Sequence, residues 1–366
     1  MSVLPGQPRA VSHGLEQPQR PRHPRRRWLR RTAVVAVVVL FTVELVLGWP
    51  SLAGALTQLR APQPGWLAAA VFAEMASMTA YARMQRRLLR SAGLVVPLYR
   101  HIALAYAAHS LSVTLPGGPA FSTRFNFQQM RRFGATPAVA AWCIALSGLL
   151  SAAGLAVVTA IGALTVHGTP PWPTLAGLAT ATLLVILGVR QLARRPEPLE
   201  PGTRAVLRVV NRLRRRPATH GLDRVHRFTG QLRAARLTPG HAAAAAAYAV
   251  LNWLLDAACL WLCFHAVTDA PVDTTQILLA FCAGMAAGTL TVIPGGLGII
   301  DSALILGLVG GGADTPNAIA TVVLYRLISF GFIIGVGWIT WLAIRHRHDQ
   351  PTPTNDAGDG DTVAHA

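Results

Sequence analysis

The sequence lacks lysine altogether: all 33 of its basic residues are arginine. Charge of either sign is scarce, because only 13% of the residues are charged whereas 52% are hydrophobic. A soluble protein of 366 residues needs a larger share of charge to cover its surface. The composition therefore excludes an ordinary soluble class and favours an integral membrane protein.

Cysteine is rare as well, and none of the four cysteines belongs to a CxxC pair or stands at zinc-ligand spacing from a histidine. All four fall inside apolar segments: Cys143, Cys259, Cys263 and Cys282. We expect packing residues here, with no disulfide framework, no metal and no other cofactor. Nucleophile-elbow and phosphate-binding-loop motifs are missing too, so the sequence does not favour an enzyme.

The formal net charge of +18 is typical of nucleic-acid binding, but its distribution argues against that class. The arginines stand in short clusters beside long apolar runs, which is the pattern that sets the orientation of membrane helices. We therefore expect no nucleic acid as partner. The expected partner surface is the anionic inner leaflet, contacted through the arginine clusters.

Residues 32–346 are predicted to form an all-α transmembrane domain with about six full spans. The expected spans are Ala33–Gly48, Trp66–Tyr81, Ala138–Val166, Leu175–Val189, His241–Val267 and Ala318–Ile344. Residues 1–31 and 347–366 have the composition of disordered tails. The first span is predicted to be an uncleaved helix, although Ala53-Gly54-Ala55 leaves a cleaved signal peptide as the alternative. The basic loop 190–240 fits an amphipathic helix on the membrane surface or a solvated linker.

The arginines also predict orientation. All except Arg60, Arg124 and Arg326 lie in the N-terminal tail or in the clusters at 25–31, 83–100, 131–132, 190–236 and 345–347. If every cluster is cytoplasmic, both termini are cytoplasmic, and the apolar stretch 98–132 begins and ends inside. The predicted span before stretch 277–312 leads out of the cytoplasm and the one after it leads back, so this stretch begins and ends outside. Neither stretch can be a single crossing, so we expect two re-entrant helical hairpins inserted from opposite sides.

Each of these stretches contains a Pro-Gly-Gly break, and the two breaks have similar surroundings. Pro137 follows Pro116 by 21 residues, and Pro316 follows Pro294 by 22 residues. The same unit in opposite orientations predicts an inverted repeat of the kind found in transporters. A simple kink in an ordinary spanning helix is the alternative for either break.

The breaks are also the predicted substrate-binding elements. A helix that starts after a break presents free N–H groups to an anion. Ser122 or Thr123 is expected to cap the first such helix, and Asp301 lies in the first turns of the second. The candidate residues from the two breaks are Pro116, Gly117, Gly118, Pro294, Gly295, Gly296 and Gly298.

Ionisable residues inside apolar segments complete the candidate site, because a lone charge in the membrane costs at least ~2.5 kcal/mol and so tends to be paired. Asp301 and Arg326 are the best predicted pair, since one follows the second break and the other lies in the next helix. Glu74 and Arg124 are predicted to pair in the same way in the first half. For each of them, a fixed salt bridge and direct substrate contact are both open.

The stretch Pro294-Gly295-Gly296-Leu297-Gly298-Ile299-Ile300-Asp301, followed by Leu324-Tyr325-Arg326-Leu327, resembles the transmembrane region of lysylphosphatidylglycerol synthases, a flippase-like family. The segment Pro116–Arg132 is similar to that family's first motif, and the likeness covers most of residues 30–346. Family members commonly carry Glu at the position of Asp301, and Gly-Glu near Ala120-Phe121. The second departure argues against a symmetrical two-carboxylate mechanism.

The resemblance implies movement of an anionic, aminoacylated or polyprenyl-linked lipid across the bacterial cytoplasmic membrane. Family members that transfer lysine carry a further aminoacyl-transferase domain, so lysyl transfer is not expected from these residues. One alternative is a non-transporting membrane partner of a separately encoded lipid-modifying or glycosyl transferase. A small-solute transporter is the other.

Overall fold

The computed structural model describes residues 63–115, 117–165, 176–177, 180, 238–289, 294–296 and 298–349. The chain divides into two compact units, Met1–Trp49 and Pro50–Ala366, and all described residues belong to the second. The predicted tails, the first span, the span Leu175–Val189 and most of the basic loop therefore lie outside the described residues.

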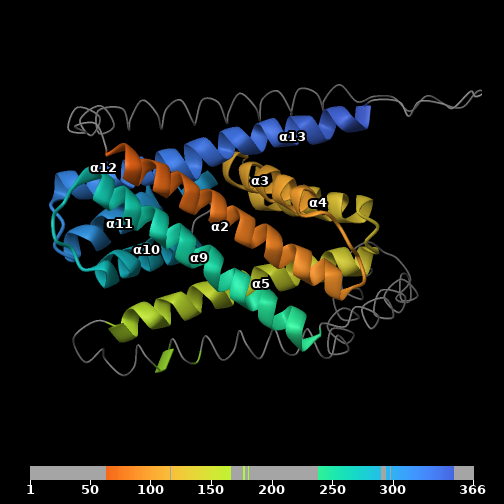
Figure 1. The fold of residues 1–366 in the computed structure, drawn as a ribbon, viewed down its shortest axis with the longest axis horizontal. Helices are drawn as coiled ribbons and strands as arrows, with labels where there is room; N and C mark the ends of the chain where they lie inside the picture. Colours follow the sequence, from red (N-terminus) through yellow and green to blue (C-terminus); the bar gives the residue numbers. More distant parts are fainter. Residues whose placement is uncertain are drawn as a thin grey trace, which may run out of the picture. The chain divides into compact units, whose positions relative to one another are not determined.

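Every regular element among the described residues is helical, as Figure 1 shows. The first half contains α2 (Pro64–Ser91), α3 (Leu98–Thr114), α4 (Gly118–Arg132) and α5 (Pro137–Thr165). The second half contains α9 (Pro239–Val267), α10 (Thr274–Thr289), the short turn η1 (Pro294–Gly296) and α11 (Ile299–Gly310). It ends with α12 (Thr315–Arg326), the π-helical turn η2 (Leu327–Phe332) and α13 (Ile333–Asp349).

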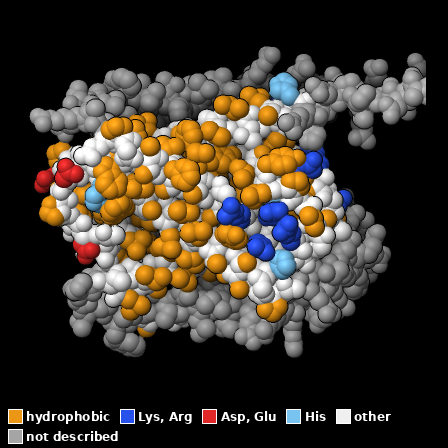
Figure 2. All heavy atoms as spheres, in the orientation of Figure 1, with side chains coloured by type: hydrophobic (Ala, Val, Ile, Leu, Met, Phe, Trp, Pro, Cys, Tyr) orange, Lys and Arg blue, Asp and Glu red, His pale blue; other side chains and the backbone are white. Residues whose placement is uncertain are grey.

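Within the described part of the chain, three helices are long and apolar enough to cross a membrane: Pro137–Thr165, Pro239–Val267 and Thr315–His346. Only 28% to 39% of their most apolar windows is buried inside the protein. Figure 2 shows the resulting broad apolar surface. Such a surface is untenable in water, whereas lipid solvates it. Three predicted spans are thus confirmed nearly to their ends, and Thr274–Gly288 and Ile299–Gly310 are shorter apolar helices.

Helix α2 differs from its prediction, because it continues ten residues beyond Tyr81. The extension is amphipathic: Met84, Leu88 and Leu89 are fully buried, while the arginines of the same turns remain half-buried or exposed. A helix with one apolar face packs against its neighbours although charge interrupts its hydropathy. The hydropathy of α2 alone does not qualify it as a membrane span.

Helices α2 and α9 pack antiparallel along their length, as Figure 1 shows. At one end the Gln63 N–H donates to the Ala266 carbonyl at 3.3 Å. In the middle the Ser77 hydroxyl donates to the Asn252 carbonyl at 3.0 Å. At the other end the Arg83 guanidinium lies 6.0 Å from the ring centre of Tyr248. This pair provides a frame along which the other helices can be placed.

The buried apolar residues form two large clusters, one centred in each half, and a small third one that joins α2 and α3 to Ile333 of α13. One cluster joins α2, α3, α4 and α5 around fully buried Leu104, Met130 and Leu146. The other joins α9, α10, α11 and α12 around fully buried Phe264, Phe281 and Leu304. Helices α2, α5 and α9 contribute to both clusters, so they connect the halves.

Helices α10 and α11 form a tight antiparallel pair, and η1 lies in their connection. A Cβ on Gly307 would lie 2.6 Å from the Ala280 Cβ, and one on Gly284 would lie 2.7 Å from a Leu304 methyl carbon. Glycine is therefore required where the two backbones approach. The open end of this pair lies beside the end of α9, because the Asn317 amide on the next helix reaches the Thr268 hydroxyl at 3.5 Å.

Helices α3 and α4 form a second antiparallel pair, which opens at the other end of the α2–α9 frame. His101 near the start of α3 stacks edge-on against Phe133 just after α4, with ring centres 5.8 Å apart. Helix α13 runs back along α3, where the Ser110 hydroxyl donates to the Ile334 carbonyl at 3.2 Å. Gly337 of α13 lies directly against Ser110 and Tyr106, where a Cβ would not fit.

Candidate functional site

The second break is built from three glycines with positive φ. Gly295, Gly296 and Gly298 have φ of 69°, 62° and 80°. Side chains rarely adopt this region, so the sequence Gly-Gly-x-Gly lets the backbone turn three times before α11 begins at Ile299. Asp301 then falls in the first turn of α11. Its Oδ2 accepts a hydrogen bond from the Gly298 N–H at 2.9 Å.

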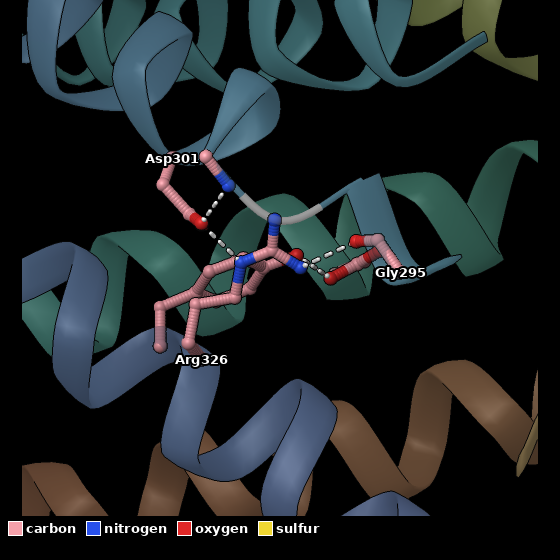
Figure 3. Close-up of polar contacts among 6 residues, drawn as sticks. Gly295, Asp301 and Arg326 are labelled. Carbon is pink, nitrogen blue, oxygen red and sulfur yellow. Dashed lines mark hydrogen bonds and ion pairs between the residues drawn. The ribbon is translucent and has the colours of Figure 1, made fainter. Parts of the chain in front are cut away.

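Arg326, the last residue of α12, reaches back to this break (Figure 3). Its Nε donates to Asp301 Oδ1 at 2.5 Å, which confirms the contact predicted between the two residues. Its Nη1 donates to the Gly295 carbonyl at 3.5 Å. The side chains of Arg326 and Asp301 are 17% and 25% exposed, so a guanidinium–carboxylate pair stands largely out of water.

One nitrogen of the guanidinium remains available. Arg326 Nη2 is buried and has no hydrogen-bond partner among the described residues. The ring of Phe330, one turn further along, lies 5.9 Å from the guanidinium carbon. An arginine cannot release its proton to relieve an unmet donor. The Nη2 position is therefore a donor that an anionic or carbonyl oxygen can satisfy.

Helix α11 does not offer an empty N-terminus, because the Asp301 carboxylate already occupies part of it. The predicted anion site at the start of α11 is therefore partly occupied by the protein's own carboxylate. The negative side chain stabilises the start of α11 and orients Arg326. At the second break it is the guanidinium, through its buried Nη2, that keeps a donor without a described partner.

Tyr325 and Asp256, which were not predicted as part of the site, lie beside this pair. The Tyr325 hydroxyl donates to Asp256 Oδ1 at 2.8 Å, and the Arg326 guanidinium is close enough to Asp256 to interact with it electrostatically. Glu74 of α2 lies next to Asp256, and its Oε2 is buried without a hydrogen-bond partner among the described residues. Glu74 therefore neighbours a carboxyl and not Arg124, its predicted partner.

The signal for these two residues was present in the sequence. Tyr325 directly precedes Arg326, and Asp256 is the only acidic residue of α9. What the sequence did not give is the rotation of α2, α9 and α12 about their axes. That rotation brings Glu74, Asp256 and Tyr325 to one place.

The first break begins with nearly the same backbone conformation as the second, but the helix that follows it starts earlier. Gly117 has φ 67° and ψ 23°, close to the 69° and 0° of Gly295. Helix α4, however, begins at once at Gly118, whose N–H donates to the Leu115 carbonyl at 2.7 Å. Pro116 lies outside the described residues, and the side chain of Pro294 is likewise not described.

The predicted cap of the first helix is wrong, because Ser122 and Thr123 lie within α4 and not at its start. The Thr123 hydroxyl donates to the Pro119 carbonyl one turn earlier, at 2.7 Å. Arg124 on the same helix is exposed and makes no hydrogen bond or ion pair with another described residue. The structure therefore does not bring Arg124 into the polar cluster.

The two breaks nevertheless lie close together. A Cβ on Gly295 would lie 3.5 Å from the Val113 carbonyl oxygen, near the end of α3, and would overlap the Phe330 ring. The turn η1 therefore abuts the α3–α4 connection. Three regions distant in sequence meet here: the end of α3, the second break with the start of α11, and the end of α12.

The four cysteines are buried and free, which confirms their predicted role in packing. Among the described residues, no group of three or more His, Cys, Asp or Glu side chains is arranged to hold a metal ion. The polar cluster consists of one guanidinium, three carboxyls and a phenol, from Arg326, Asp301, Asp256, Glu74 and Tyr325.

The family comparison agrees with this architecture. Residues 28–337 match the family described as the lysylphosphatidylglycerol synthase TM region, which spans both breaks and the Arg326 helix. The comparison with curated proteins gives no match. The match covers well over half of the chain, and the apolar helices show a multi-pass integral membrane protein. The chain therefore belongs to the lysylphosphatidylglycerol synthase TM-region family.

Proposed function

We propose that this protein is a flippase-like transporter that moves an anionic, aminoacylated or polyprenyl-linked lipid across the bacterial cytoplasmic membrane. The observation that carries the proposal is the Arg326 guanidinium. It is fixed by Asp301 and the Gly295 carbonyl, and its Nη2 is buried without a described partner. A phosphate oxygen of a lipid headgroup would complete its hydrogen bonds.

In this proposal α3–α4 and α10–α11 are re-entrant hairpins of an inverted repeat, entering the membrane from opposite sides. Their openings at opposite ends of the α2–α9 frame support this arrangement. The contact between η1 and the end of α3 would then lie near the middle of the bilayer. Backbone that leaves helical geometry at that depth is tolerated where it lines a wet cavity or is buried in protein.

Transport would alternate the exposure of this point to the two leaflets. Arg326 would hold the phosphate, while Glu74 and Asp256 would pair with a cationic group such as that of an aminoacylated headgroup. Most buried apolar residues belong to one large cluster centred in each half, and α2, α5, α9 and the small third cluster connect the two. This division supports a rocking of one half against the other. The protein's role is proposed as transport without catalysis.

Lipid scrambling in reconstituted liposomes tests the function. Fluorescent anionic and polyprenyl-phosphate lipids are placed in the inner leaflet, and their exposure to a membrane-impermeant quencher is followed. We expect Arg326→Gln and Asp301→Asn to slow the movement at least tenfold, whereas Arg124→Gln leaves it unchanged. No movement of any of these lipids by the unmodified protein would refute the proposal.

The orientation has its own test, in a variant whose four cysteines are replaced by alanine. Arg132 and Thr315 are both exposed and follow the two hairpins. We expect Arg132→Cys to react with a membrane-impermeant maleimide only from the cytoplasmic side, and Thr315→Cys only from the outside. Reaction of both from one side would rule out hairpins of opposite orientation.

A further inference from the structure

A cleft lies apart from the polar cluster, between α13 and the opening of the α3–α4 pair. Its volume is about 360 Å³, which is within the usual range for small-molecule sites. The lining residues that matter below come from α3, from the end of α4 and from α13: Tyr99, Arg100, Ala103, Leu104, Arg132, Ala343 and Ile344.

The lining is chemically divided. Arg100 and Arg132 are exposed, and no described carboxylate pairs with either. The Arg100 guanidinium lies over the Tyr99 ring at 5.9 Å, and the Tyr99 hydroxyl accepts its Nε–H at 3.3 Å. Two guanidiniums in one cleft repel each other unless an anion lies between them. This part of the cleft therefore suits a phosphate, which arginine binds in a bidentate manner.

The rest of the cleft is apolar. Ala103 and Leu104 lie one turn along α3 from Arg100, and Ala343 and Ile344 face them from α13. Helices α3 and α13 run antiparallel and close against each other where Gly337 meets Ser110, so the apolar walls lie between that contact and the arginines. An occupant must therefore carry an anionic group and an apolar chain together. In a membrane protein, the abundant molecule with this structure is an anionic phospholipid.

We infer that this cleft binds an anionic phospholipid, with its phosphate between Arg100 and Arg132 and the start of an acyl chain along Ala103, Leu104 and Ala343. The site is distinct from the Arg326 cluster, and its occupation does not require transport. A lipid held here would contact α3 and α4 from the side of α13. It would therefore bind the same helix pair that carries the first break.

Equilibrium binding tests the inference in the full chain. The protein is placed in phosphatidylcholine nanodiscs with spin-labelled phosphatidylglycerol, and the immobilised fraction of the label is measured. We expect Arg100→Gln with Arg132→Gln to weaken selective binding about tenfold, since charge-assisted hydrogen bonds to the phosphate are lost. Ala343→Trp, which fills the apolar part while keeping both charges, is expected to weaken it similarly.

Matched controls separate this site from general attraction. Arg87→Gln with Arg90→Gln removes the same charge from a neighbouring basic cavity, lined by Arg83, Arg86, Arg87, Arg90, Leu98 and Tyr248. Leu342→Trp places a tryptophan of the same size at an exposed position next to Ala343. Both controls are expected to keep the binding. An equal loss in the arginine control would refute a specific site.

Two further outcomes would overturn part of the inference or assign the site to another ligand. Unchanged binding in Ala343→Trp would overturn the acyl-chain part of the inference. Displacement of the lipid by inorganic phosphate at millimolar concentration would assign the site to free phosphate instead. The binding experiment does not measure scrambling. A failure of the proposed transport would therefore leave a positive binding result standing, and a failure of binding would leave the transport proposal standing.

Discussion

The two Pro-Gly-Gly breaks begin alike and end differently. Gly117 and Gly295 share a left-handed conformation, with φ of 67° and 69°. After Gly117 the helix starts at once, whereas Gly296 and Gly298 hold the second break in the left-handed region until α11 starts at Ile299. The longer turn places Asp301 in the first turn of α11, where it meets Arg326. A repeated backbone motif therefore does not imply repeated chemistry.

The chemistry differs accordingly. The second break carries a guanidinium–carboxylate pair with a buried free donor, and the first carries an exposed Arg124 without a described partner. Ala120 and Phe121 stand where the family resemblance implies Gly-Glu. The first break contributes backbone shape and packing, and the second contributes charge. Four measurements test this division, from the largest expected effect to the smallest.

Alanine at the two equivalent glycines should separate packing from conformation. Gly117→Ala meets open space and is expected to cost about 1–2 kcal/mol of stability, because of its left-handed φ alone. Gly295→Ala carries the same strain and also drives its Cβ into the Phe330 ring, so we expect about 2–4 kcal/mol in total. Reversible unfolding in mixed micelles measures both. Equal losses would mean that η1 is not held against α12 and η2.

The ion pair should show coupling that the first break lacks. Asp301→Asn and Arg326→Gln are each expected to destabilise by about 2–3 kcal/mol, below the range for fully buried pairs since both side chains are partly exposed. In a double-mutant cycle the coupling energy is expected to be about 1–2 kcal/mol. The same cycle on Glu74→Gln and Arg124→Gln should give none. Coupling in that second cycle would restore the symmetrical arrangement.

Tyr325→Phe tests the polar group beside the pair. The variant removes the hydroxyl that donates to Asp256 at 2.8 Å and keeps the ring. A hydrogen bond to a carboxylate contributes about 1.5–3 kcal/mol, so we expect a loss of about that size or somewhat less. Ser77→Ala, which removes a hydrogen bond between α2 and Asn252 of α9, serves as the control. A smaller loss for Tyr325→Phe than for the control would place Tyr325 outside the site.

Arg124→Gln is expected to change stability by less than about 0.5 kcal/mol, as for a surface position without a partner. The measurement is again the free energy of unfolding in mixed micelles. A loss comparable to that of Arg326→Gln would show that the first break has an ionic partner after all, and would remove the asymmetry between the halves.

Much of the fold was predictable because it follows from length and hydropathy. The span predicted over Ala138–Val166 is α5 at Pro137–Thr165, and the one over His241–Val267 is α9 at Pro239–Val267. The Asp301–Arg326 contact was predictable because the break fixes the position of one partner and the next helix that of the other. Both inferences need only local sequence and the direction of the chain.

The rest depends on long-range packing. Glu74 lies beside Asp256 because α2 and α9 pack antiparallel in a particular register, with Ser77 against Asn252. No local pattern fixes that register. The start of α4 at Gly118 was missed for a similar reason. Its first turn packs against the carbonyls of Leu111 and Ser112, which replaces the side-chain cap expected from Ser122 or Thr123.

The wide turn η2, which directly follows Arg326, has a consequence for the helix that contains it. A π-helical turn accommodates one residue more than an α-helical turn, and each residue of an α-helix rotates the chain by about 100°. The turn therefore resets the helical phase between α12 and α13. Arg326 can face η1 while Gly337 faces Ser110 of α3. Deleting one residue from Leu327–Phe332 would make the two requirements incompatible, since the helix could then satisfy the ion pair or the close packing, but not both.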